Sequence, residues 1–474
     1  MSVINTNIQS LIAQNVLATN NSQLDTSLER LSTGLQINSG ADNPSGYIAV
    51  QDFNQENTGL STAINNAALA GNVAGTAQGG LGQISDLLTQ LQGLVGQAAN
   101  SGGVSADQVS ADQLQVDSIL DTINRIANGT NFQGIGLLNG NLNYVTSGVK
   151  TSAVQNLQIN SAILPDSGNL TVAVSVVSKA GLADVTSTIG TVTGSAITLQ
   201  INGNLGSVQL TFASGTKASA IAAAVNGVTS QTGVTASATL SATGGSKGLA
   251  LISQDYGAAQ FVSVKVSGGT YAFAEDNASG TDAHVNINGV SATAAGNSIS
   301  YNGNGLDVQF DLASGLAAGT TEQFYVTGGG ATFALGALVT DAGKASIGIG
   351  SVETSQLGDA TDGYLNSLGT GGANDLSSTS LTTAQKIITA AINQVSSLSG
   401  RIGAFQDYTI GSTVSALNVA YENSSAAESA IQDTNFASET SNLTRSQILS
   451  QAASTVLAQA NARPDQALTL LQNA

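Results

Sequence analysis

The sequence predicts an α+β multidomain protein in which N- and C-terminal helices pair in an α-helical coiled-coil body, with a mainly β or α+β insertion in the middle. Apolar residues recur about every 3.5 residues at both ends of the chain, as in a coiled coil. Between about residues 145 and 360 the apolar period changes to two, which is typical of strands. Each helical end lacks partners of its own, so we expect the two ends to pack together.

Composition excludes several classes of function. The 474 residues include no cysteine, no tryptophan and one histidine, His284, so disulfides, thiol chemistry and cysteine or multi-histidine metal sites are excluded. The net charge of −18 comes from 12 basic and 30 acidic residues, and the basic residues are scattered. Nucleic acid and anionic membranes are therefore not expected as partners, because both require clustered Lys and Arg.

Nothing in the sequence predicts membrane insertion. No window holds 18 consecutive apolar residues, the length that a spanning helix requires. The N-terminal sequence MSVINTNIQSLIAQN has neither the basic start nor the unbroken apolar core of a Sec signal. If the protein leaves the cell, we expect it to use another route.

The first 140 residues predict three helices. The first ends at GADNPSG (residues 40–46), whose Gly, Asn and Pro favour a turn. The second is expected from about Thr58 to Asn100, and the third closes at Asn128-Gly129. Their apolar faces are Leu81, Ile84, Leu88, Leu91, Val95 and Ala98 for the second helix, and Val116, Ile119, Ile123 and Ile126 for the third.

Four glycines lie inside the second predicted helix, namely Gly71, Gly75, Gly79 and Gly82. Each costs about 1 kcal/mol relative to alanine in a helix interior. Either the helix is broken here, or the glycines form a smooth strip that lets another backbone come close.

The middle of the chain predicts short strands between Gly, Asn and Ser turns, forming two small α+β or all-β subdomains. The expected strands are 170–177, 196–201, 208–212 and 261–266, and residues 217–226 read as one helix. Segments 197–212 and 284–310 resemble each other, since in each a strand enters an Ile-Asn-Gly turn and another strand leaves.

From about Thr382 the pattern returns to helix. The apolar face is expected to comprise Ile388, Ala391, Val395, Leu398, Ile402 and Phe405, continued by Ala416, Val419, Ala426 and Ala430. The last helix is predicted from Asn442 onward, with Pro464 kinking or interrupting it before the final leucines.

Two apolar seams share a 4-3-4 spacing at the opposite ends of the chain. They consist of Leu24, Leu28, Leu31 and Leu35 near the N-terminus, and of Leu449, Ala453, Val456 and Ala460 near the C-terminus. We expect these two seams to meet and to serve assembly.

The terminal motifs resemble those of bacterial flagellins. The matching segments are SVINTNIQSLIAQN, ERLSTGLQINSGADNPSGYIAV and INRIANGTNFQGIGLLNG at one end, and RIGAFQ, AIQDTNFASETSNLTRSQILSQAASTVLAQAN and LTLL at the other. The Ile-Asn-Gly turns of the middle resemble the hook IN type of flagellin insertion. About 250 residues carry the resemblance.

The resemblance implies a structural subunit that is exported unfolded by a type III route and self-assembles into the extracellular flagellar filament. It implies inner terminal helices (1–42 and 434–474), a surrounding helical coiled-coil domain (43–142 and 365–433) and an outward-facing variable insertion (143–364). The implied partners are copies of the same chain, the flagellar cap, the hook–filament junction proteins and an export chaperone.

The chain departs from the family pattern at several positions. Gln36 stands where the family commonly has Arg, and residues 40–44 replace a charged stretch. The family motif LQRVREL, which Toll-like immune receptors recognise in some flagellins, corresponds to LTQLQGL at 88–94. There Leu94 matches and Gln90 replaces an Arg, while the next helix offers Gln113 and Leu114 near a usual Glu. Weak receptor recognition through Gln90 and Leu94 is expected.

No catalytic, cofactor-binding or metal-binding residue is predicted. His284 is expected to be an exposed strand residue, since no second imidazole or thiol can join it. The acidic residues Glu428, Asp433 and Glu439 are expected at helix surfaces or subunit contacts, and GTGG (369–372) lacks the Lys and Ser/Thr of a phosphate-binding loop.

The two alternatives to a filament subunit are a surface adhesin and an enzyme. A surface adhesin or glycan-binding homologue would act through residues 145–360, although no residue there identifies a ligand. An enzyme of the zincin type would require an HExxH motif, which is absent from the sequence.

Overall fold

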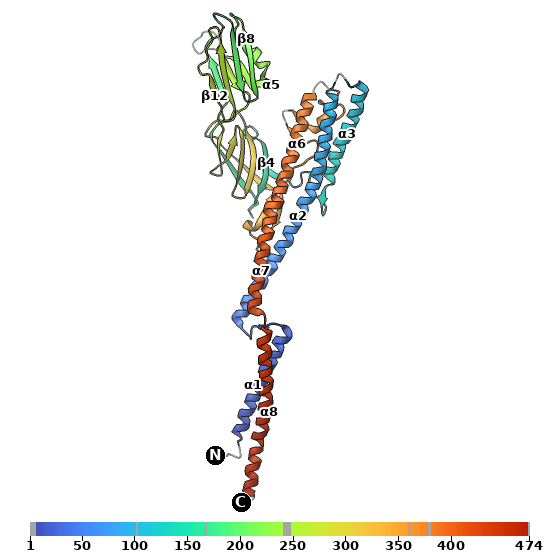
Figure 1. Ribbon diagram of the computed structural model, residues 1–474, viewed down its shortest axis with the longest axis vertical. Coiled ribbons are helices and arrows are strands. Elements are labelled where there is room, and N and C mark those ends of the chain that lie inside the picture. Colours follow the sequence, from blue (N-terminus) through green and yellow to red (C-terminus); the bar gives the residue numbers. More distant parts are fainter. Residues whose placement is uncertain are drawn as a thin grey trace. The chain divides into compact units, whose positions relative to one another are not determined.

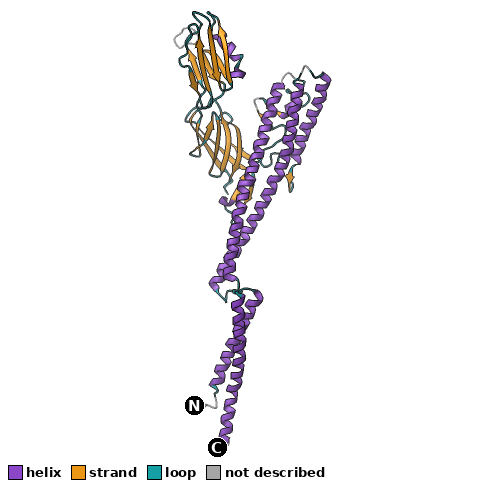
Figure 2. Ribbon diagram, in the orientation of Figure 1, coloured by secondary structure: helices purple, strands orange, loops and turns teal. Residues whose placement is uncertain are grey.

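The computed structural model describes residues 6–100, 103–165, 168–239, 248–359, 362–377 and 381–472, apart from the side chains of residues 239, 464–468 and 470–472. The chain divides into two compact units. The first comprises Met1–Ala68, Ala334–Gly343 and Ile410–Ala474, and the second comprises Leu69–Phe333 and Lys344–Thr409. Helices at both ends and a strand-rich middle confirm the predicted fold class (Figures 1 and 2).

The first unit is built from helices. It contains α1 (Ile8–Thr33), the start of α2 (Pro44–Ala98), α7 (Ser412–Gln432) and α8 (Phe436–Gln472). The longest seam in this unit is that of α1 against α8, which lie side by side (Figure 1). A smaller cluster joins α2 to α7 through Leu60, Ala63 and Leu417.

The helical part of the second unit packs α2, α3 (Ala106–Gly129) and α6 (Leu381–Ala404) around one apolar core. The predicted faces of the second and third helices and of α6 are confirmed, since Leu88, Ile123 and Val395 are each at most 1% exposed. Ser105 caps α3 by accepting a hydrogen bond from the Gln108 amide, as its position before the first turn favours.

Two β-rich cores form the rest of the second unit. One core lies between a sheet of order β14-β13-β5-β18-β3 and a sheet of order β15-β16-β17-β4. The other lies among a sheet of order β12-β11-β7-β8, a sheet of order β6-β10-β9 and α4 (Ala218–Asn226), with α5 (Thr229–Thr232) beside it. The alternation of buried and half-buried residues along β7 shows why a period of two marks these segments.

The strands of these sheets have the following bounds: β3 Tyr144–Ser147, β4 Val154–Ala162, β5 Leu170–Ser178, β6 Asp184–Ser187, β7 Ile197–Gly203, β8 Gly206–Phe212, β9 Val234–Thr239, β10 Gly248–Ser253, β11 Phe261–Ser267, β12 Asn277–Ser279, β13 His284–Ile287, β14 Val290–Ser291, β15 Thr293–Ala295, β16 Ser298–Gly303, β17 Leu306–Leu312 and β18 Thr321–Gly329. Short pairs are formed by β1 (Asn131–Phe132) with β2 (Ile135–Gly136), β19 (Ala331–Ala334) with β20 (Lys344–Ile347), and β21 (Gly358–Asp359) with β22 (Gly363–Tyr364). Two short 3₁₀ helices, η1 (Asp341–Gly343) and η2 (Leu365–Leu368), complete the connections.

The two Ile-Asn-Gly segments turn differently. Asn288 and Gly289 are themselves the turn between β13 and β14, with φ values of 50° and 84°. In the other segment Gly203 still pairs with Gly206, so Asn204 and Leu205 make the turn. The predicted likeness therefore holds for hairpin formation and is wrong for the position of the first turn.

The second helix is longer than predicted and unbroken. Pro44 begins α2, because proline at the first helical position needs no backbone hydrogen-bond donor. The helix continues through Gly71, Gly75, Gly79 and Gly82, which excludes the broken alternative. Among the described residues, a Cβ added at any of these four would meet no atom within 4 Å beyond the neighbouring residues and backbone of α2 itself, so no other described backbone approaches the strip.

The buried face predicted for α7 is wrong by one residue. Val419 is 58% exposed, and Ala416, Ala426 and Ala430 are exposed too, whereas Leu417 and Ser424 are buried. A π-helical stretch, η3 (Phe405–Gly411), lies between α6 and α7. A π turn holds one more residue than an α turn, and this moves every later buried position one residue along.

Candidate assembly interface

The helices α1 and α8 form an antiparallel pair that is held by hydrogen bonds along its length. Near its free end, Asn7 Nδ2 donates to the Ala460 carbonyl at 2.7 Å and Ser10 Oγ donates to Asn461 Oδ1 at 2.6 Å. At mid-length, Ser450 Oγ donates to Asn21 Oδ1 at 2.7 Å. These bonds join residues more than four hundred positions apart and set the register of the pair.

The other end of the pair is closed by the backbone. The Gln36 amide donates to the Gln432 carbonyl at 2.6 Å, and the Thr434 amide donates to the Gly34 carbonyl at 2.9 Å. Gly34 has φ 77° and caps α1 in the left-handed conformation that glycine adopts at low cost. Gln36, one of the departures from the family pattern, thus contributes here through its backbone.

The fully buried positions between α1 and α8 are small or polar side chains and, apart from Ser10, they recur every seven residues. On α1 it contains Ser10, Ala13, Asn20 and Ser27, and on α8 it contains Glu439, Ser446, Ala453 and Ala460. Half-buried leucines alternate with them, namely Leu17, Leu24 and Leu31 on α1 and Leu443 and Leu457 on α8. This is the spacing of a coiled coil, but with small residues where large ones usually lie.

Glu439 is a carboxylate within this seam, and it is only 7% exposed. It accepts a hydrogen bond from Ser27 Oγ at 2.6 Å and lies 3.9 Å from the Arg30 guanidinium. A buried charge that is paired and hydrogen-bonded in this way fixes register, because sliding the helices would leave it unpaired. Sequence reasoning places Glu439 at a helix surface or a subunit contact, whereas it lies in the seam within one chain. The spacing of apolar residues gives no sign of its pairing with Ser27 and Arg30.

The predicted seam is only partly the observed one. Ala453 and Ala460 are buried, and Leu24, Leu31 and Leu35 are half-buried. Leu28, Leu449 and Val456, however, are 47%, 43% and 55% exposed. The 4-3-4 reading selected the large residues, whereas the helices approach through the small Ser27 and Ser446 and turn the large ones outward.

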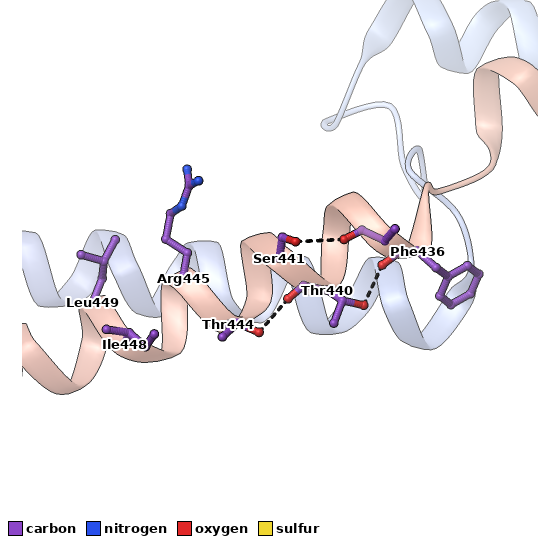
Figure 3. Close-up of a pocket in the computed structure, with 8 residues that line it drawn as sticks. Phe436, Thr440, Ser441, Thr444, Arg445, Ile448 and Leu449 are labelled. Atoms are coloured by element: carbon purple, nitrogen blue, oxygen red, sulfur yellow. Dashed lines mark hydrogen bonds between the residues drawn. The ribbon is translucent and has the colours of Figure 1, made fainter.

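Large apolar side chains therefore gather on the outer surface of the pair. On α1 they are Ile8, Leu11, Ile12, Val16 and Leu28, and on α8 they are Phe436, Ile448, Leu449 and Val456, all at least 43% exposed. A shallow depression of about 760 Å³ runs along α8 from Phe436 to Leu449, past Thr440, Thr444 and Arg445 (Figure 3). Surfaces of this kind mark sites of protein association.

The residues compared with the immune-receptor motif are placed differently from one another. Gln90 is exposed on α2, whereas Leu94 is 9% exposed and packs in the helical core. Leu94 is thus largely covered within its own chain. Gln113 is also buried, where it donates to the Leu368 carbonyl at 2.9 Å and accepts from the Leu376 amide at 2.8 Å.

His284 lies exposed at the start of β13, as predicted, with Nε2 3.2 Å from Ser291 Oγ. Within the described residues, no group of three or more His, Asp or Glu side chains is placed to hold a metal ion. Of the two acidic residues grouped with Glu439, Glu428 accepts from Asn57 Nδ2 at 2.6 Å, and Asp433 pairs with Leu35 where α1 and α8 meet. Among the described helices none is long and apolar enough to cross a membrane.

Three family models match the chain. They are the bacterial flagellin N-terminal helical region at residues 4–143, the bacterial flagellin C-terminal helical region at 385–471, and the flagellin hook IN motif at 197–253. The first and second include α1 and α8, whose pairing forms the candidate interface.

Similar proteins match from end to end. Flagellin D of Vibrio anguillarum is 30% identical over 99% of both chains, and a flagellin of Salmonella typhimurium is 29% identical over 99% of both. Among solved structures, that of flagellar hook associated protein-3 from Legionella pneumophila aligns with 80% of this chain and 97% of its own at 12% identity and a TM-score of 0.30.

Terminal helices that pair with each other and present large apolar side chains outward are typical of a subunit that associates with other chains. The family models and the full-length relatives identify the kind of subunit, because they match both ends of the chain and the insertion. The chain belongs to the bacterial flagellin family and is a structural subunit of the flagellar filament. The comparisons give the adhesin alternative no support.

Proposed function

We propose that this chain leaves the cell unfolded by a type III route, without a cleaved signal peptide, and polymerises with copies of itself into an extracellular filament for swimming. The observation that carries the proposal is the outward apolar surface of α1 and α8. Burying it against neighbouring copies contributes about 25 cal/mol for each Å² of apolar area removed from water. An isolated subunit gains none of this, so folding of its ends is coupled to assembly.

In this proposal residues 1–42 and 434–474 form the innermost layer of the filament. Residues 43–142 and 365–433 surround it, and the insertion (143–364) faces outward. The three predicted seam residues that are exposed in the single chain, Leu28, Leu449 and Val456, then contact other subunits. The flagellar cap, hook–filament junction proteins and an export chaperone are the further partners, and the protein has no enzymatic activity.

Removal of residues 440–474 tests this function. The truncated chain loses nearly all of α8, and with it the partner of α1, but keeps every residue of the two β-rich cores. We expect the insertion to unfold at an unchanged temperature, and electron microscopy to show no filaments after seeding. Filaments of normal length from the truncated chain would contradict the proposal.

A further inference from the structure

The outer surfaces of α1 and α8 carry charges of opposite sign. Within the chain, Arg30 of α1 is paired with Glu439 of α8. The charged residues left on α1 are Asp25 and Glu29, and those left on α8 as far as residue 463 are Arg445 and Arg463, all of them exposed. The helix α1 thus presents negative charge to a neighbouring chain, and α8 presents positive charge.

These charges lie beside large apolar side chains. On α1, Asp25 is three residues before Leu28 and Glu29 directly follows it, and Leu28 is 47% exposed. On α8, Arg445 and Leu449 are four residues apart, so they share one face of the helix. Both line the depression of about 760 Å³ (Figure 3). Each outer surface therefore combines apolar area with charge of one sign.

The outer charges are not used inside the chain. Among the described residues, no ion pair joins Asp25, Glu29 or Arg445 to another side chain. An exposed charge gains little from a partner while water surrounds it. Burial of the apolar side chains beside it removes that water and strengthens the attraction to an opposite charge. A second copy of the chain can supply both the apolar area and the opposite charge.

Charge also decides which outer surfaces meet. Two α8 surfaces would bring positive charges together, and two α1 surfaces would bring carboxylates together, so like charges disfavour both arrangements. The surface of α1 against that of α8 is the arrangement in which the charges match. A contact between two different surfaces need not close after two copies, so it can continue from chain to chain into an open helical polymer.

We propose that α1 of one copy docks on the depression along α8 of the next copy, with Leu28 in the depression and the carboxylates of Asp25 and Glu29 beside Arg445. This inference rests on the proposed function, because it names the surface of the second copy that α8 meets. The matched charges select the partner surface, and the apolar side chains supply the burial.

Two charge-reversal variants of the full chain test this contact. Asp25→Lys/Glu29→Lys makes the outer charge of α1 positive, and Arg445→Glu places a negative charge in the depression. Each variant alone brings like charges together, so the concentration needed for seeded polymerisation should rise about tenfold. An equimolar mixture restores opposite charges between unlike chains and should polymerise near the wild-type concentration. Such rescue would show that both variants fold and that the charges act between chains.

Asp52→Lys/Glu56→Lys is the matched control, since it reverses an exposed Asp and an exposed Glu with the same spacing of four on α2. It should polymerise like the wild type. The proposal is overturned if either reversal variant alone polymerises at the wild-type concentration, if the mixture gives no rescue, or if the control is impaired equally. The proposed function would survive those results as long as the wild type forms filaments, whereas absence of wild-type filaments would overturn both.

Discussion

Glycine serves two different purposes along α2. Gly75, like the three other glycines of the strip, faces open space within the chain, so its missing side chain relieves no contact there. Gly80 is buried, and a Cβ at that position would lie 2.7 Å from both Leu138 Cδ1 and Thr130 Oγ1. The sequence alone could not separate these two cases, because both glycines occupy the same helix interior.

Alanine at these two positions should therefore act in opposite directions. Gly75→Ala is expected to raise the free energy of unfolding by up to about 1 kcal/mol, since alanine is the better helix former. Gly80→Ala is expected to lower it by about 1–3 kcal/mol, because Leu138 and Thr130 must move in a packed core. Thermal or urea unfolding of the two variants beside wild type measures both effects. Equal changes in the same direction would contradict this account.

Asp117 ties α3 to the turn at residues 369–372. Its Oδ1 accepts from the Thr370 amide at 2.8 Å and from Gln113 Nε2 at 3.0 Å, and its Oδ2 accepts from Thr370 Oγ1 at 2.6 Å. Burial raises the pKa of the Asp117 carboxyl, but the hydrogen bonds from Thr370 and Gln113 outweigh burial and hold the pKa below its usual value. The glycine-rich turn is thus a structural contact.

This lowered pKa predicts a dependence of stability on pH. A carboxyl whose pKa is lower in the folded state stabilises the protein above its unfolded-state pKa of about 3.9, and the stabilisation is lost as the pH falls through the folded-state value. Asp117→Asn should cost on the order of 1 kcal/mol at neutral pH. The difference in free energy of unfolding between Asp117→Asn and wild type should shrink as the pH falls below about 4. Urea unfolding of both proteins across this pH range measures the difference in free energy of unfolding. A difference that stays constant with pH would refute the lowered pKa of Asp117.

At the scale of elements, the π-helical stretch η3 separates two registers of one helical run. Before it, the buried positions Val395, Leu398 and Ile402 follow the predicted 3-4 pattern. After it, the pattern resumes one residue late, at Ile410, Leu417 and Ser424. The extra residue of the π turn accounts for the whole shift. Once that residue is counted, the predicted spacing of buried positions is correct on both sides of η3.

Deleting one residue from η3 should consequently be tolerated. Removal of the exposed Asp407 lets the run continue as a regular α-helix with the same buried faces, and we expect a loss of at most about 1 kcal/mol. Removal of the equally exposed Ser397 rotates the end of α6 out of its core and should cost at least about 3 kcal/mol, since core side chains are displaced. Urea unfolding compares the two. A larger loss for the Asp407 deletion would show that the π turn itself is required.

Whether an element can be predicted from the sequence depends on which interaction buries its residues. The helices, the strands of the insertion and α4 were predictable because burial against a neighbour imposes a period of 3.6 or 2 on apolar residues. The seam of α1 and α8 was not, because Ser27, Glu439 and Ser446 are buried there by close backbone approach and hydrogen bonding. A search for leucines cannot find a seam of small and polar residues.

Pro464 shows that a proline in the sequence does not by itself predict where a helix ends. The helix α8 is continuous to Gln472, so the predicted interruption at Pro464 is wrong. A proline removes one hydrogen bond and bends a helix without always ending it. The final leucines at 468, 470 and 471 lie outside the described side chains.

At the scale of the whole molecule, the cores of the second unit and the seam of the α1–α8 pair are built from different kinds of residue. The cores of the second unit bury their large apolar residues internally, as Phe310 and Phe324 illustrate. In the α1–α8 pair the fully buried residues are small or polar, the seam leucines are only half-buried, and other large apolar residues face outward. We infer that the insertion is stable alone, whereas the terminal pair depends on burial that only other copies of the chain can supply.

Seeded polymerisation of a single-residue variant tests this claim most directly. Leu449→Asp places a charge on the outer face of α8, where the side chain is 43% exposed and leaves the seam with α1 intact. Gln447→Glu adds a charge at another exposed position of the same helix and serves as the control. Electron microscopy should show filaments from wild type and the control but monomers with a normally folded insertion from Leu449→Asp. Filaments forming at the wild-type rate from Leu449→Asp, or persistent wild-type monomers after seeding, would contradict the account.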